Sequence, residues 1–147
     1  MVPSASTLAS SLSSMFQDPI VYQRLQKHGF DVWANYQSGT KEALMLLEKA
    51  TPPKNHETTV LWISNYIGNI LEWEIARSER SDIQGNSFQL RFDKLYPQIA
   101  IQGRSLLNFI QSIGYDSLSK IDFLLRGIIV RYNLGEWVMV RNYDVTE

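Results

Sequence analysis

The chain of 147 residues has the length of one ordinary domain, and its 44% hydrophobic and 20% charged residues are typical of a globular protein, not a disordered one. A net charge of −1 excludes the strong basic excess of a free-standing nucleic-acid-binding protein, and the absence of cysteine excludes disulfides and thiolate metal sites. No stretch is apolar for long enough to cross a membrane, so the sequence predicts a soluble protein of the reducing cytoplasm.

The N-terminal segment, residues 1–17, is rich in serine and contains neither lysine nor arginine. It lacks the basic start and the apolar core of a secretory signal, and we expect a flexible leader or a weak helix here. The first firm helix is predicted to open at Asp18-Pro19, because aspartate suits the N-cap and proline suits the first turn. Gly29 is predicted to end it, and residues 18–147 are expected to form a single helical domain.

Two further helices are predicted before residue 81. The first runs from Thr40 to about Ala50, where the two prolines that follow stop it. The segment from about Asn55 to Arg80 gives the strongest helical prediction, because apolar residues recur there at the three-and-four spacing of one buried face. These residues are Val60, Ile63, Ile67, Ile70 and Leu71.

The second half of the chain continues the helical pattern. Ser87 is predicted to cap a helix, and Pro97 either kinks that helix or begins a new one in its first turn. Gly114 is a predicted stop, and Asp116 or Ser117 is the predicted cap of the next helix. The sequence therefore predicts an all-α bundle of five or six helices.

The segment from residue 128 to residue 143 is open to two interpretations. Its β-branched residues flank Asn133-Leu134-Gly135-Glu136, a pattern that fits a small C-terminal β-hairpin with a four-residue turn. The same residues can continue the preceding helix to about Tyr132 and then form a turn and an extended or short helical tail, which is the alternative that we favour.

No recognisable catalytic arrangement is present in the sequence. The two histidines, His28 and His56, lie in different segments, and neither has a partner at the spacing of metal ligands. The chain has no nucleophile elbow and no glycine-rich phosphate loop. We therefore predict no catalytic residues, no metal ligands and no cofactor, and we do not expect an enzyme.

Two groups of residues are candidates for binding. Trp62, Tyr66 and Trp73 form an aromatic stripe beside the buried face of the long helix, and such residues are frequent in interface hot spots as well as in cores. Seven of the eight arginines lie after residue 76. The candidate contacts to an anion or to nucleic acid among them are Arg77, Arg80, Arg126, Arg131 and Arg141.

The function predicted from these features is that of a non-enzymatic helical subunit or adaptor that acts by protein–protein contact within a larger assembly. Its partner is another protein or a second copy of itself, and no membrane contact is expected. The alternative is a small helical subunit of a nucleoprotein complex, in which the second-half arginines and aromatic residues contact nucleic acid while neighbouring subunits supply charge.

Overall fold

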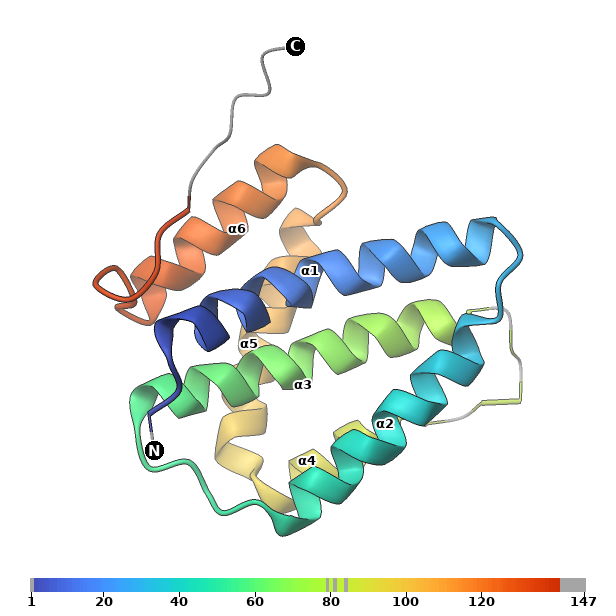
Figure 1. Ribbon diagram of the computed structural model, residues 1–147, viewed down its shortest axis with the longest axis horizontal. Helices are drawn as coiled ribbons and strands as arrows, with labels where there is room; N and C mark the ends of the chain where they lie inside the picture. The colour runs from blue at the N-terminus through green and yellow to red at the C-terminus, as the bar shows by residue number, and fades with distance from the viewer. Residues whose placement is uncertain (1, 79, 81, 84, 141–147) are drawn as a thin grey trace.

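The structure is a computed structural model that describes residues 2–78, 80, 82–83 and 85–140. The described residues contain six α-helices and no strand, which confirms the all-α prediction (Figure 1). Within the same residues, no helix is long and apolar enough to cross a membrane. The helices are α1 (Ala5–Lys27), α2 (Val32–Lys49), α3 (His56–Ala76), α4 (Ser87–Leu95), α5 (Pro97–Ile113) and α6 (Leu118–Arg131).

Helix α1 begins at Ala5, so the prediction that the first helix opens at Asp18-Pro19 is wrong. Of the two alternatives for residues 1–17, a flexible leader or a helix, residues 5–17 form the helix. The Ser4 hydroxyl caps the helix by accepting a hydrogen bond from the backbone N–H of Thr7 at 3.0 Å. Pro19 lies inside the helix, because packing along α3 outweighs the local signal for a start. Four side chains of the segment 5–17 are buried in the core: Leu8, Leu12, Met15 and Phe16.

Helix α2 also begins earlier than the sequence predicted. Gly29 ends the first segment with a φ of 83°, as expected, and Asp31 then caps α2 through its carboxylate. The predicted start at Thr40 is therefore wrong, since the preceding aromatic stretch is the first half of the same helix. Gly39 lies within it, where a Cβ would meet nothing within 4 Å, so this glycine marks no boundary.

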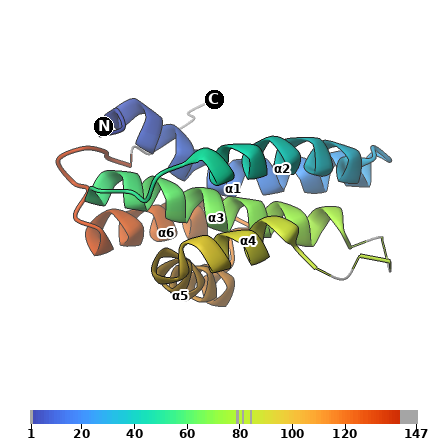
Figure 2. The same cartoon turned by 90° about the horizontal axis from the view of Figure 1, so that it is seen from below.

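Helix α3 is the central element. Figure 2 shows it between α1 and α2 on one side and α4 and α5 on the other, and all four of these helices contact it. The Asn55 side chain caps α3 by accepting from the backbone N–H of Thr58 at 2.8 Å. The helix ends at Ala76, four residues before the predicted end at Arg80. Its buried residues include the whole predicted apolar face, together with Ser64, Tyr66, Ile75 and Ala76.

Helices α4 and α5 cover the other side of α3. Asn86, rather than Ser87, caps α4, and Pro97 begins α5 as its first residue, which is one of the two predicted alternatives. Gly103 lets α5 approach α3 closely, because a Cβ there would lie 2.6 Å from the ring of Tyr66. Gly114 ends α5 with a φ of 82°, as predicted.

The C-terminal β-hairpin that the sequence left open is not present in the described residues. Ser117 caps α6, and the helix continues through residues 128–131, so the first half of the supposed hairpin is helical. Leu124 and Ile128 are buried one turn apart and fix this helix on the core. Asn133, with a φ of 53°, then turns the chain, and residues 135–140 contain no strand. Residues 141–143 of the predicted hairpin lie outside the described part.

The buried face of residues 5–17 generates a stability prediction. Leu8 has no exposed surface, so Leu8→Ala should lower the free energy of unfolding by roughly 2–5 kcal/mol. Leu118, which is 86% exposed at the start of α6, is the matched control, and Leu118→Ala should change the stability by less than about 0.5 kcal/mol. Urea unfolding followed by circular dichroism measures both, and equal midpoints for the two variants would contradict the position of α1.

The contact between α5 and α3 generates a second prediction. Gly103→Ala should destabilise the fold by roughly 1–3 kcal/mol, because the new methyl group meets a Tyr66 ring that is fully buried and cannot move away. Gly39→Ala places the same methyl group in open space on α2 and should stabilise the fold by roughly 0.5–1 kcal/mol. Thermal melts of the two variants should therefore shift in opposite directions from the wild type.

Candidate functional site

A cleft lies between α1 and α2. The two helices diverge from their connecting turn and both lie on α3, so that α3 forms the floor of the space between them (Figure 1). This α1–α2 cleft has a volume of about 940 Å³. That volume lies near the upper end of the range for ligand sites, roughly 300–1,000 Å³.

The walls of the α1–α2 cleft are built from small and hydroxyl-bearing side chains at helical spacing. Residues three or four apart share one face of a helix, so each helix contributes one stripe. Because many side chains in these stripes are short, they do not fill the space between α1 and α2 above α3. The stripes are Thr7, Ser10, Ser14 and Asp18 on α1, Tyr36, Thr40, Ala43 and Leu47 on α2, and Asn65, Gly68, Asn69 and Glu72 on α3.

Among the described residues, the charged side chains that line the cleft are those of Asp18 and Glu72, which are both acidic. Burial and, to a smaller extent, the nearby carboxylate of Asp18 together raise the pKa of the Glu72 carboxyl to about 7. Burial also raises the pKa of Asp18, and burial together with these two acids raises the pKa of the Tyr22 hydroxyl to about 12. In the described part of the chain, Glu72 forms neither an ion pair nor a side-chain hydrogen bond.

A buried polar network stands next to this carboxyl. The Tyr36 hydroxyl donates to the side-chain oxygen of Asn69 at 3.0 Å, and the Asn69 amide donates to the Thr40 hydroxyl at 3.1 Å. The amide of Asn86 also donates to Asn69 at 3.1 Å, which ties the start of α4 to α3. These groups satisfy one another and hold α2, α3 and α4 in register. Glu72 lies one turn beyond Asn69 and is left out of the network.

On the other side of α2, aromatic and arginine side chains gather at the end of α3. The Arg77 guanidinium carbon lies 4.5 Å from the centroid of the Trp73 ring, and that of Arg80 lies 5.9 Å from the Trp33 ring. We call Trp33, Trp73, Arg77 and Arg80 the aromatic–arginine cluster. The structure thus brings together three of the sequence-predicted candidates and adds Trp33, which the sequence did not single out.

The predicted aromatic stripe of α3 does not form one surface. Tyr66 has no exposed surface, and its hydroxyl donates to Asp93 at 2.8 Å, so it is a core residue. Trp62 is half-buried and packs edge-to-face on Tyr96 with ring centroids 4.6 Å apart. Trp73 alone of the three belongs to the aromatic–arginine cluster.

The remaining predicted arginines lie elsewhere. Arg126 pairs with Asp122 on the same helix at 2.9 Å, and Arg131 donates to the Ser105 hydroxyl at 3.2 Å. The C-terminal end of α6 lies at the opposite end of the molecule from the C-terminal end of α3 (Figures 1 and 2). Arg141 lies outside the described residues. The second-half arginines therefore do not form a single continuous stripe.

Neither histidine belongs to a recognisable site. His28 is exposed at the end of α1, and a ring nitrogen of His56 lies 2.5 Å from the backbone oxygen of Tyr132. Across the described residues, no group of three or more histidine, aspartate or glutamate side chains is placed to hold a metal ion.

Comparisons with known proteins give no relative. No family model matches the chain, and neither the curated proteins nor the solved structures yield a match.

The sequence did not single out Glu72 as a candidate, and its place in the cleft was missed. A signal was nevertheless present in the sequence. Asn65, Asn69 and Glu72 interrupt an otherwise apolar helix at spacings of four and three, which places polar groups along one line of its surface. The serines of residues 1–17 carry a matching pattern, although only the fold shows that the two stripes face one cleft.

The raised pKa of Glu72 predicts how stability depends on pH. Because the pKa is about 7 in the folded chain and about 4.5 for an ordinary glutamate, ionisation between these pH values favours the unfolded state. The free energy of unfolding should fall across this window, by roughly 3 kcal/mol at most for this one group.

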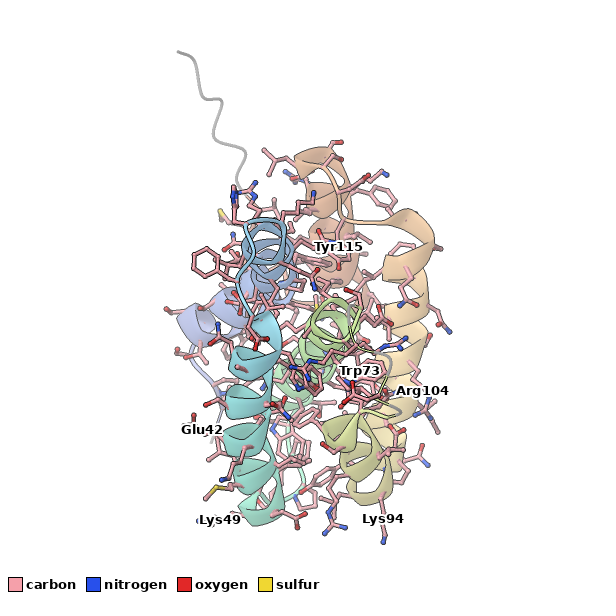
Figure 3. The ribbon with its side chains drawn as sticks, turned by 90° about the vertical axis from the view of Figure 1, so that its right-hand side faces the viewer. Glu42, Lys49, Trp73, Lys94, Arg104 and Tyr115 are labelled. Carbon is pink, nitrogen blue, oxygen red and sulfur yellow. The ribbon has the colours of Figure 1, made fainter. Side chains whose placement is uncertain are left out.

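Glu72→Gln should flatten that decline, whereas Glu42→Gln, an exposed acid on the outer side of α2 (Figure 3), should leave it unchanged. Urea unfolding at a series of pH values measures the slope. A wild-type stability that is constant across the window would show that the Glu72 carboxyl is well solvated.

Proposed function

We propose that this chain is a non-enzymatic helical adaptor that binds a segment of a partner protein in the α1–α2 cleft, and that this segment presents a lysine or arginine side chain to Glu72. The observation that supports the proposal is the cleft itself, an open groove whose charged lining residues are two acids. One of them, Glu72, is mostly buried and has no partner among the described residues. A buried carboxylate is stable only when paired, and a partner's cation would supply the pair.

The two ends of the cleft differ in chemistry, which defines the occupant further. At the end where α1 and α2 lie farthest apart, the lining includes Leu46, which is 66% exposed, and Leu61. At the closed end stand Asp18, Tyr22 and Glu72. A segment with apolar residues at one end and a basic residue at the other complements both. Such an amphipathic segment buries apolar surface and satisfies the carboxyl in one binding event.

Binding of a cation at Glu72 is coupled to proton release. The partner's charge favours the ionised carboxylate, so the occupant binds the deprotonated form and lowers the pKa of Glu72. Because that pKa is about 7 in the free protein, affinity should rise roughly tenfold between about pH 6 and about pH 8.

The alternative, contact with nucleic acid, rests on the arginines of the aromatic–arginine cluster. It does not draw on the cleft, whose acidic lining repels phosphate. Arg126 and Arg104 are also engaged with aspartates, at 2.9 Å each, so fewer cations are available than the sequence suggested. The adaptor proposal uses the larger of the two sites and is the one that we favour.

Selection of short random peptides displayed on phage, with the whole chain as bait, tests the adaptor proposal. Peptides that bind the wild type should share a lysine or arginine flanked by apolar residues. Glu72→Gln should weaken the binding of a selected peptide by at least about tenfold. A buried ion pair with a hydrogen bond contributes roughly 1.4 kcal/mol or more to binding. Replacing the peptide's basic residue with norleucine should have the same effect.

Glu42→Gln is the matched control, because Glu42 is exposed on the outer side of α2 and should not affect binding. Recovery of no peptide, or of peptides that bind wild type and Glu72→Gln equally, would refute the proposal. Self-association detected by sedimentation and abolished by Glu72→Gln would identify the occupant as a second copy of the chain, which contradicts a separate partner.

A further inference from the structure

A second pocket lies on the other side of α2 from the cleft. It has a volume of about 380 Å³ and is lined by α2, the end of α3 and residues Ile83, Gly85 and Ser87. Figure 3 shows Trp73 directed inward between α2 and α4. The lining residues that matter most are Trp33, Tyr36, Lys41, Leu44 and Trp73.

The charges around this pocket are opposite to those of the cleft. Lys41 is the charged residue in the described lining, and the guanidinium groups of Arg77 and Arg80 lie over the rings of Trp73 and Trp33. None of these three cations forms an ion pair within the described residues. A guanidinium that stacks on an aromatic ring keeps its N–H edges available for an anion.

Two acids next to the cluster in the chain, Glu74 and Asp31, have other partners. Burial raises the pKa of the Glu74 carboxyl, and the nearby Arg77 guanidinium opposes this rise. The Glu74 carboxylate accepts a hydrogen bond from Gln111 on α5 at 3.3 Å. Asp31 accepts from the backbone N–H of Trp33 at 3.1 Å as the cap of α2. Neither acid lines the pocket.

One wall of the pocket contains an unsatisfied donor. The indole N–H of Trp73 is buried and has no hydrogen-bond partner among the described residues. Buried polar groups are almost always paired, so an unpaired indole in a pocket wall is an uncommon feature. Because this N–H is buried, the part of Trp73 that a ligand in the pocket can contact is its ring.

We propose that this pocket binds a small organic anion, a planar ring that carries a phosphate or carboxylate group. The ring packs against Trp33, Trp73 and Leu44, and the oxyanion lies toward Lys41 and the two guanidinium groups. The volume of about 380 Å³ matches a small ligand, near the lower end of the usual range. Tyr36 and Thr40 line both this pocket and the α1–α2 cleft, but the anion site does not rest on the adaptor proposal.

Nuclear magnetic resonance of the indole N–H groups tests the site directly. The chain has four tryptophans, so each indole signal can be assigned with a Trp→Phe variant. Phenyl phosphate and benzoate are the probes, and at least one of them should shift the Trp73 and Trp33 signals in a saturable manner. Which of the two binds more tightly identifies the anion as phosphate or carboxylate.

Two further compounds separate charge from shape. Benzyl alcohol keeps the ring without the charge, and inorganic phosphate keeps the charge without the ring. Both should bind at least about tenfold more weakly than the better probe. Equal binding of benzyl alcohol would refute an anion site, and equal binding of inorganic phosphate would refute the role of the ring.

Lys41→Gln should weaken the better probe by about fivefold or more, which corresponds to the loss of one charged contact. Lys49→Gln is the matched control, since Lys49 is exposed at the far end of the same helix (Figure 3) and does not line the pocket. Both lysines are exposed, so neither variant endangers folding. Absence of any shift at Trp73 with either probe, or equal effects of the two variants, would overturn the proposal.

Discussion

The burial of α3 is the constraint on which the other helices depend. Its apolar side chains cover so much of its girth that no single neighbour can remove them from water. Residues such as Ile63, Ile67 and Leu71 are buried on one line of the helix, and Tyr66 is buried on another. Helices α1 and α2 therefore cover one side while α4 and α5 cover the other, with Gly103 allowing α5 close against Tyr66. The segment of residues 5–17, which has little reason to be helical alone, is helical because it completes this cover.

The same helix explains why the cover is incomplete. Along one line of α3, Asn65, Asn69 and Glu72 replace apolar side chains with polar ones. Tight closure of α1 against α2 above this line would remove the Glu72 carboxyl from water without a partner, which is costly for a charged group. Divergence of the two helices creates the cleft and leaves the mostly buried carboxyl at its floor, where an occupant can reach it. The network of Tyr36 and Asn69 fixes the closed end of the cleft, so the opening has a defined shape.

Local chemistry predicted the elements that depend on caps and stops, and failed where distant packing decides. Pro97, Gly114 and Ser117 occupy roles that the sequence indicated, because each role is settled within a few residues. Pro19 misled the prediction, since contacts with α3 extend α1 through it. The alternative of a C-terminal hairpin failed for a similar reason, because burial of one face holds residues 128–131 in α6. The cleft and the aromatic–arginine cluster were only partly foreseeable, because their residues come from helices whose arrangement no single segment specifies.

The central claim is that the floor of the cleft holds a carboxyl that is shielded from water and unpaired in the free protein. Carbon-detected nuclear magnetic resonance titration of the side-chain carboxyl of Glu72, identified by its loss in Glu72→Gln, measures this property without requiring a partner. The structure predicts a pKa of about 7 for this group. A measured value near 4.5, the ordinary value for glutamate, would show that the carboxyl is fully solvated and would contradict the basis of the proposed recognition.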